Sequence, residues 1–114
     1  MSLTNPATIQ ARVKALGTEL GRIDATVLHY WHPRQAAPYI LWQEDSCDTF
    51  KADNKSAERK WVGVVDLYTQ TEYDELLDDI VAALENVGAV WKISSVDYED
   101  ETNLIHFTFD WELM

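Results

Sequence analysis

The apolar positions of this chain predict a helix near its N-terminus. Asn5 and Pro6 suit a helix start, because an asparagine side chain can cap free amide groups and proline is tolerated in the first helical turn. Apolar residues then recur at spacings of four, three and four on one helical face, at Ile9, Val13, Leu16 and Leu20. Gly21 is placed to end this helix.

Three strands are predicted in the next part of the chain. Residues 23–31 and 39–42 are rich in β-branched and aromatic side chains, and the sequence HPRQAAP with its two prolines separates them. These two strands could pair as a hairpin. Residues 61–68 alternate between two sets of side chains, which predicts a third and central strand.

A second helix is predicted within the segment TQTEYDELLDDIVAALENVG, residues 69–88. Thr71 is a candidate cap, acidic residues occupy the first turn where the helix dipole favours them, and Gly88 is placed to end the helix. Its apolar stripe consists of Tyr73, Leu76, Leu77, Ile80, Leu84 and Val87.

The C-terminal part predicts a β-hairpin, with strands over 89–98 and 104–113 joined by EDETN. In the last strand Ile105, Phe107, Phe109, Trp111 and Leu113 share one face, as expected for a sheet that is covered on one side only. The acidic cluster around Glu99, Asp100 and Glu101 is then most simply the solvated tip of this hairpin.

Residues 43–60 lack any apolar period and are predicted to be a long polar interaction loop. This segment contains four of the nine basic residues of the chain, namely Lys51, Lys55, Arg59 and Lys60. An acidic surface of a partner, or of a second copy, could contact it. The alternative is an ordinary solvated loop whose charges face water.

The predicted fold class is α+β, with the element order α-β-β-β-α-β-β in a single domain spanning residues 1–114. The sheet is expected to be mainly antiparallel or mixed. Both helices are expected to pack on one face of it, because each has a single apolar stripe.

Charge is distributed unevenly along the chain, whose formal net charge is −11. The residues from Asp66 onward contain thirteen acids and only one base, Lys92. This charge disfavours sequence-specific binding to nucleic acid and binding to anionic membranes. No segment approaches the length of a membrane span, and neither a signal segment nor a disulfide is expected, which favours the cytoplasm.

No motif in the sequence predicts an enzyme, a cofactor or a metal site. The acidic cluster lacks the glycine of a calcium loop and lies between strands. His106, Asp110 and Glu112 share a strand face and could line a metal or acid–base site, but no second histidine is suitably spaced. Cys47 has no flanking signature of a catalytic nucleophile. No catalytic residue is therefore predicted.

Three stretches of the chain resemble a known group of proteins: PYILWQED at 38–45, FKADN with GVVDLYTQTEYDELLDDI across 50–80, and SVDYEDETNLIHFTFDWEL at 95–113. In order and spacing they are similar to small minor tail proteins of tailed bacteriophages and prophages, of the tail-terminator or tail-completion type. This resemblance implies a non-enzymatic virion protein that forms a ring, often of six copies. Such a ring caps the tail tube and joins it to the head connector, after assembly in the cytoplasm of the bacterial host.

A ring subunit needs two different surfaces that bind each other. The basic residues of 51–60 could contact an acidic surface of the next subunit, and the candidates on that surface are Asp74, Glu75, Asp78, Asp79, Glu99, Asp100 and Glu101. The excess carboxylates could also line the bore of the ring, where they would keep DNA from adhering.

Two other classes of protein stay open. An acidic binding module or nucleic-acid mimic would sequester a basic partner protein and remain monomeric or dimeric alone. A small enzyme could assemble a pocket from residues that are distant in the sequence.

Overall fold

The computed structural model describes residues 8–31, 33–52 and 56–114. Its elements follow the predicted order: α1 (Thr8–Gly21), β1 (Thr26–His29), β2 (Tyr39–Ala52), β3 (Ser56–Thr69), α2 (Leu76–Asn86), β4 (Val90–Glu99) and β5 (Leu104–Leu113). The predicted helix start at Asn5 and Pro6 lies outside the described residues.

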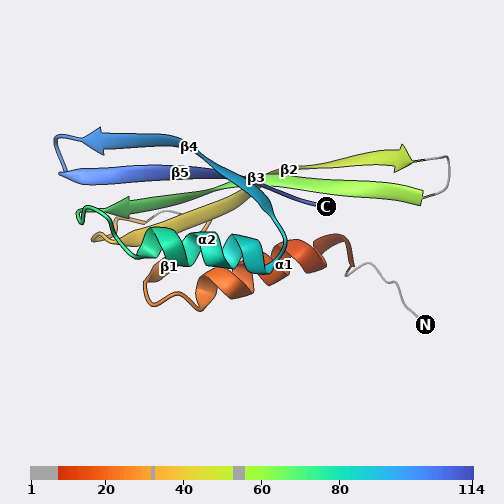
Figure 1. Ribbon diagram of the computed structural model, residues 1–114, viewed down its shortest axis with the longest axis horizontal. Helices are drawn as coiled ribbons and strands as arrows, with labels where there is room; N and C mark the ends of the chain where they lie inside the picture. Colours follow the sequence, from red (N-terminus) through yellow and green to blue (C-terminus); the bar gives the residue numbers. More distant parts are fainter. Residues whose placement is uncertain (1–7, 32, 53–55) are drawn as a thin grey trace.

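The strands form one five-stranded mixed sheet in the order β1-β2-β3-β5-β4. β1 and β2 run parallel, and the pairs β2–β3, β3–β5 and β5–β4 are antiparallel. Both helices lie on the same face of this sheet, below it in Figure 1, and leave the other face open. The predicted α+β class, the element order and the placement of the helices are confirmed.

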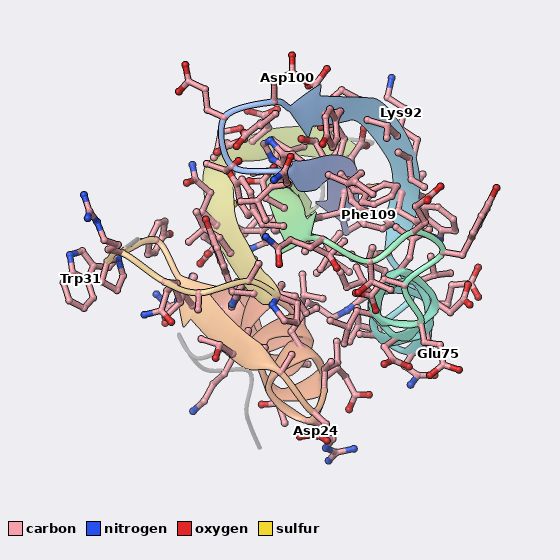
Figure 2. All side chains as sticks on the ribbon, turned by 90° about the vertical axis from the view of Figure 1, so that its left-hand side faces the viewer. Asp24, Trp31, Glu75, Lys92, Asp100 and Phe109 are labelled. Carbon is pink, nitrogen blue, oxygen red and sulfur yellow. The ribbon has the colours of Figure 1, made fainter. Side chains whose placement is uncertain are left out.

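The core lies between this face and the two helices. Leu16 and Leu20 of α1 and Ile80 and Leu84 of α2 are fully buried, as the apolar stripes predicted. The alternation of β5 is also confirmed, because Phe109, Trp111 and Leu113 are buried while Glu112 between them is exposed. Figure 2 shows Phe109 in the centre of the molecule between the sheet and the helices.

Two glycines let large rings lie close to the backbone. A Cβ atom on Gly17 of α1 would lie 2.8 Å from Cζ2 of Trp42, so the absence of a side chain lets the Trp42 ring approach the helix. A Cβ atom on Gly63 of β3 would overlap the ring of Trp111 and the carbonyl oxygen of Gln43. These contacts set how closely α1 packs on the sheet and how Trp111 lies over β3.

The predicted hairpin of the first two strands is wrong, because β1 and β2 run parallel. The first strand is also shorter than the predicted range 23–31. Tyr30, which directly follows it, has φ 65°, and the chain turns out of the sheet there. The connection 30–38 is long enough to bring the chain back beside the start of β1, so that Tyr39 pairs with Thr26.

The predicted loop at 43–60 is wrong as a description of its conformation. Residues 43–52 belong to β2 and residues 56–60 to β3, and these strands pair as far as Ala52 and Ser56, with one shift of register between Glu44 and Ser46. We call the part of this hairpin beyond Ser46 and Val62 the arm. The arm extends past the helices toward the right in Figure 1, while the β4–β5 hairpin points to the left. The molecule is therefore elongated, at 52 × 24 × 24 Å.

Candidate functional site

The acidic cluster that stood out in the sequence forms the turn of the β4–β5 hairpin. Asp100 and Glu101 are exposed there, and Figure 2 shows Asp100 at the outer end of the hairpin. Glu99 accepts a hydrogen bond of 3.1 Å from the Thr102 hydroxyl, and Asn103 adopts the left-handed conformation (φ 58°) that tight turns use. The carboxylates thus flank a turn, as the sequence predicted.

The acidic candidates at the start of α2 and just before it fall into two groups. Asp74 is structural: its Oδ1 accepts the Leu76 amide at 2.9 Å and its Oδ2 accepts the Thr69 hydroxyl at 2.5 Å. Thr71, the predicted cap, does not cap this helix; its amide donates to the Thr69 hydroxyl at 3.1 Å. The other candidates, Glu75, Asp78 and Asp79, are exposed, and Figure 2 shows Glu75 at the outer surface.

The basic candidates that the structure describes, Lys51, Arg59 and Lys60, belong to the arm. Arg59 is exposed, and Lys60 forms an ion pair of 3.6 Å with Glu112 on β5. Lys55 lies outside the described residues, and Lys51 is in β2 with its side chain outside the described part. Among the described residues, no ion pair joins these bases to the acids of α2 or of the β4–β5 turn within one subunit.

A polar and aromatic cluster crosses the open face of the sheet, and sequence analysis missed it. His106 Nε2 lies 2.8 Å from Oδ1 of Asp66, and the Thr108 hydroxyl donates to the same oxygen at 3.0 Å. Tyr68 stacks on His106 with ring centroids 4.1 Å apart, and Tyr39 stacks on Tyr68 at 4.7 Å. The cluster therefore joins β2, β3 and β5.

The electrostatics of this cluster follow from its hydrogen bonds and burial. The hydrogen bond to Asp66 raises the pKa of His106, although partial burial acts in the opposite direction. Burial raises the pKa of Tyr68 to about 12, with the charge of Asp66 acting in the same direction. The cluster thus favours the protonated form of the histidine and the neutral form of the tyrosine.

His106 does not line a site with Asp110 and Glu112, the group considered from the sequence. It pairs with Asp66, while Glu112 contacts Lys60. In the part of the chain that the structure describes, no group of three or more His, Cys, Asp or Glu side chains is arranged to hold a metal ion.

A groove lies on the helix side of the sheet, where the arm leaves the body of the molecule. Its volume is about 470 Å³, and it is lined by Gln10, Val13, Lys14, Gly17, Thr18, His29, Trp42, Glu44 and Trp61. We call it the arm-root groove. His29 stacks on Trp42 with centroids 3.9 Å apart, and its Nε2 lies 2.5 Å from Oε1 of Glu44. Apolar ring faces and charged groups therefore occur side by side in it.

The opposite end of the molecule exposes apolar side chains. β4 forms one edge of the sheet, and toward this end it exposes Val96 and Tyr98 to more than half of their full area. Val90, at the other end of β4, is also exposed but lies level with Val62 at the root of the arm. Tyr73, in the connection between β3 and α2, is 96% exposed. Exposed apolar groups concentrated in this way are typical of interaction surfaces.

The sequence signals for these features were incomplete. Alternation places Asp66 with Tyr68 on one face of β3 and His106 with Thr108 on one face of β5, but it does not say which residues lie opposite each other. The groove could not be found from local motifs, because its lining comes from α1, β1, β2 and β3.

Comparison with known proteins finds no matching family model and no matching curated protein. Among solved structures, the chain is similar to a chain of the structure described as "Virion of native gene transfer agent (GTA) particle". The two are 12% identical, the match covers 91% of this chain and 88% of that chain, and the TM-score is 0.48.

In the described part of the chain, neither helix has the length and the apolar character that a membrane span requires.

Proposed function

We propose that this chain is a non-enzymatic structural protein of a phage-type particle, a tail terminator or a minor tail component. In this proposal copies form a ring that caps the tail tube and joins it to the head connector. The proposal rests on the sequence resemblance at 38–45, 50–80 and 95–113 together with the surface of the folded subunit.

The observation that carries the proposal is the difference between the two ends of the subunit. One end bears the arm, with Arg59, Lys60 and the arm-root groove. The other end bears the exposed side chains Val96 and Tyr98 of β4 and the acidic turn. Two unlike surfaces at opposite ends (Figure 1) support head-to-tail contacts, which close into a ring when the rotation between neighbours is suitable.

Electrostatics supports the same arrangement. Identical subunits with a net charge of −11 repel each other unless acidic surfaces contact the few basic ones. The arm supplies bases from residues 51–60, and the acidic side of the contact consists of Glu75, Asp78, Asp79 and the β4–β5 turn. Asp74 is left out of this surface because it caps α2.

The test is the assembly of the purified protein. We expect electron microscopy to show rings and sedimentation to show an oligomer whose stability falls as salt is raised. Reversal of charge at Lys55, Arg59 and Lys60 to Glu is expected to abolish assembly, as followed by light scattering across salt concentrations.

A matched control changes the net charge by the same amount elsewhere, by substituting Glu at Arg22, Arg34 and Lys92, which are all exposed. Assembly that withstands the arm variant, or that is lost equally in both variants, contradicts the role of the arm. A protein that forms no ring but binds a basic partner protein as a monomer or dimer favours the acidic binding module instead.

A further inference from the structure

Tyr73 is held in an unusual position at the end of the molecule that is opposite the arm. Its backbone has φ 55°, a conformation that bulky residues rarely adopt, and its side chain is 96% exposed. The connection that carries it is fixed by the hydrogen bonds of the Thr69 hydroxyl to Asp74 and to the Thr71 amide. The fold thus projects an aromatic ring into solvent.

The arm-root groove has the size and lining to receive such a ring. Its volume of about 470 Å³ is in the range of sites that bury small ligands. Trp61 and the His29 ring, which stacks on the buried Trp42, supply aromatic surface, and Lys14 offers an ammonium group to a hydroxyl oxygen. A tyrosine, apolar along the ring and polar at its tip, matches this combination.

Local charges are complementary as well. Glu72 directly precedes Tyr73 and Glu75 follows two residues later, and both acids are exposed. On the other side Lys14 lines the groove, and Arg59, two residues before Trp61, shares its face of β3. Acids therefore lie beside the projecting ring, and Lys14 and Arg59 supply the unlike charge, while Glu44 in the groove is paired with His29.

We propose that Tyr73 of one copy inserts into the arm-root groove of a second copy. This inference rests on the proposed function, since it names the contact by which neighbouring ring subunits recognise each other. The β3–α2 connection lies at the left-hand end of the molecule in Figure 1, whereas the groove lies at the root of the arm. The contact is therefore head-to-tail. Each subunit inserts its Tyr73 side chain into one neighbour and receives the Tyr73 side chain of the other neighbour in its groove.

Other exposed aromatic residues fit the groove less well. The Tyr98 hydroxyl already donates a hydrogen bond of 2.9 Å to Asn103. Trp31 lies in the connection that follows β1, which itself contributes His29 to the groove. Tyr73, in contrast, projects outward from a fixed connection, has acidic neighbours in the sequence, and lies at the end of the molecule opposite the arm.

The direct test places the photo-crosslinking residue p-benzoylphenylalanine at position 73 of the full chain, with position 98 as the matched control. Isotope-labelled and unlabelled protein are mixed, so that mass spectrometry identifies links between different copies. We expect position 73 to link to peptides that contain residues 10–18, 42–44 or 61, and position 98 not to do so. Links from position 73 to other surfaces, or no links between copies, overturn the inference.

Substitutions provide an independent readout. Tyr73→Ala is expected to weaken self-association roughly 30-fold or more, as removal of a central aromatic contact does, without changing the unfolding curve of the subunit. Glu72→Lys and Lys14→Glu are each expected to weaken association, and their combination in one chain is expected to restore it. Rings that form equally well with Tyr73→Ala overturn this inference and leave the proposed function standing, whereas a wild-type protein that never associates overturns both.

Discussion

At the scale of single residues, the contact between His106 and Asp66 ties together two central strands on the open face of the sheet. Both side chains are mostly shielded from water, with exposed fractions of 21% and 17%. Other ionisable groups surround the histidine: Tyr68 stacks on it, Asp97 lies opposite it on β4, and Glu99 acts on it from the same strand. Protonation of His106 therefore offsets part of the negative charge on this face.

This arrangement predicts a dependence of stability on pH. The folded state raises the pKa of His106 above its usual value near 6.5, chiefly through the hydrogen bond to Asp66. Its contribution to the free energy of unfolding is therefore fully present below about pH 6.5 and is lost as the pH rises through the folded pKa. We expect His106→Gln to cost about 1 kcal/mol at pH 5.5 and less at pH 9, as measured by urea unfolding.

The matched control is Asp66→Asn, which keeps the shape of the side chain and removes its charge. In this variant the pKa of His106, followed by NMR titration, is expected to fall, and the pH-dependent part of the stability is expected to disappear. A wild-type His106 that titrates at or below its usual value would contradict the prediction.

The sequence could predict the faces of the strands but not which residues lie opposite each other. Alternation assigned His106 to the wet face of the last strand and the acids of 99–101 to a turn, and both assignments agree with the structure. The partner of His106 is 40 residues away, on a strand separated from it by α2 and β4. Register between such strands depends on how the whole sheet packs, so the cluster has no local signature.

At the scale of elements, the start of α2 shows why similar polar residues are hard to tell apart from sequence. Thr71 and Asp74 both have side chains that can accept a hydrogen bond from a free helix amide. Tyr73, with its positive φ, places a turn between them, and the helix then begins at Leu76. The side chain of Asp74 therefore lies next to the free amide of Leu76, whereas Thr71 is five residues before Leu76 and does not cap the helix.

We expect Asp74→Ala to lower the free energy of unfolding by about 1–2 kcal/mol, because the Leu76 amide and the Thr69 hydroxyl both lose an acceptor. Thr71→Ala is the matched control and is expected to change it by less than about 0.5 kcal/mol, since the hydrogen bond made by its backbone amide remains. Urea unfolding at pH 7 measures both. Equal losses in the two variants would indicate that Thr71 contributes as much as Asp74.

The arm shows a different reason for the failure of sequence prediction. Strand patterns arise because one face is buried, and the arm extends beyond the helices that cover the rest of the sheet (Figure 1). Its strands are therefore held by backbone pairing and leave no apolar period in the sequence. Once the register is known, one favourable cross-strand pair can be recognised in the sequence, because Asp48 and Lys60, which carry unlike charges, lie opposite each other.

At the scale of the whole molecule, the fold separates a body that holds the buried core from an arm, of which Trp61 at the root packs against that core. Every buried apolar side chain among the described residues belongs to the helices or to the strands beneath them, and Trp42 is the last of these on β2 before the arm begins. A hairpin of this length is weakly stable by itself when it has no helix to cover it. Its retention in the sequence is best explained by contacts outside the subunit, as the proposed ring requires.

A variant with a shortened arm can distinguish the role of the arm in folding from its role in assembly. Thr49 and Arg59 lie directly opposite each other, so a two-residue Asn-Gly turn can replace residues 50–58 and preserve the register of the remaining strands. Because the buried core is unchanged, we expect the variant to unfold within about 1 kcal/mol of the wild type in urea. Because the tip of the arm and the bases Lys51 and Lys55 are gone, we expect sedimentation to show monomers where the wild type forms rings. A variant that still forms rings would mean that the arm is dispensable and that contacts near the arm-root groove and Tyr73 suffice, whereas one that unfolds early would mean that the arm belongs to the folding unit.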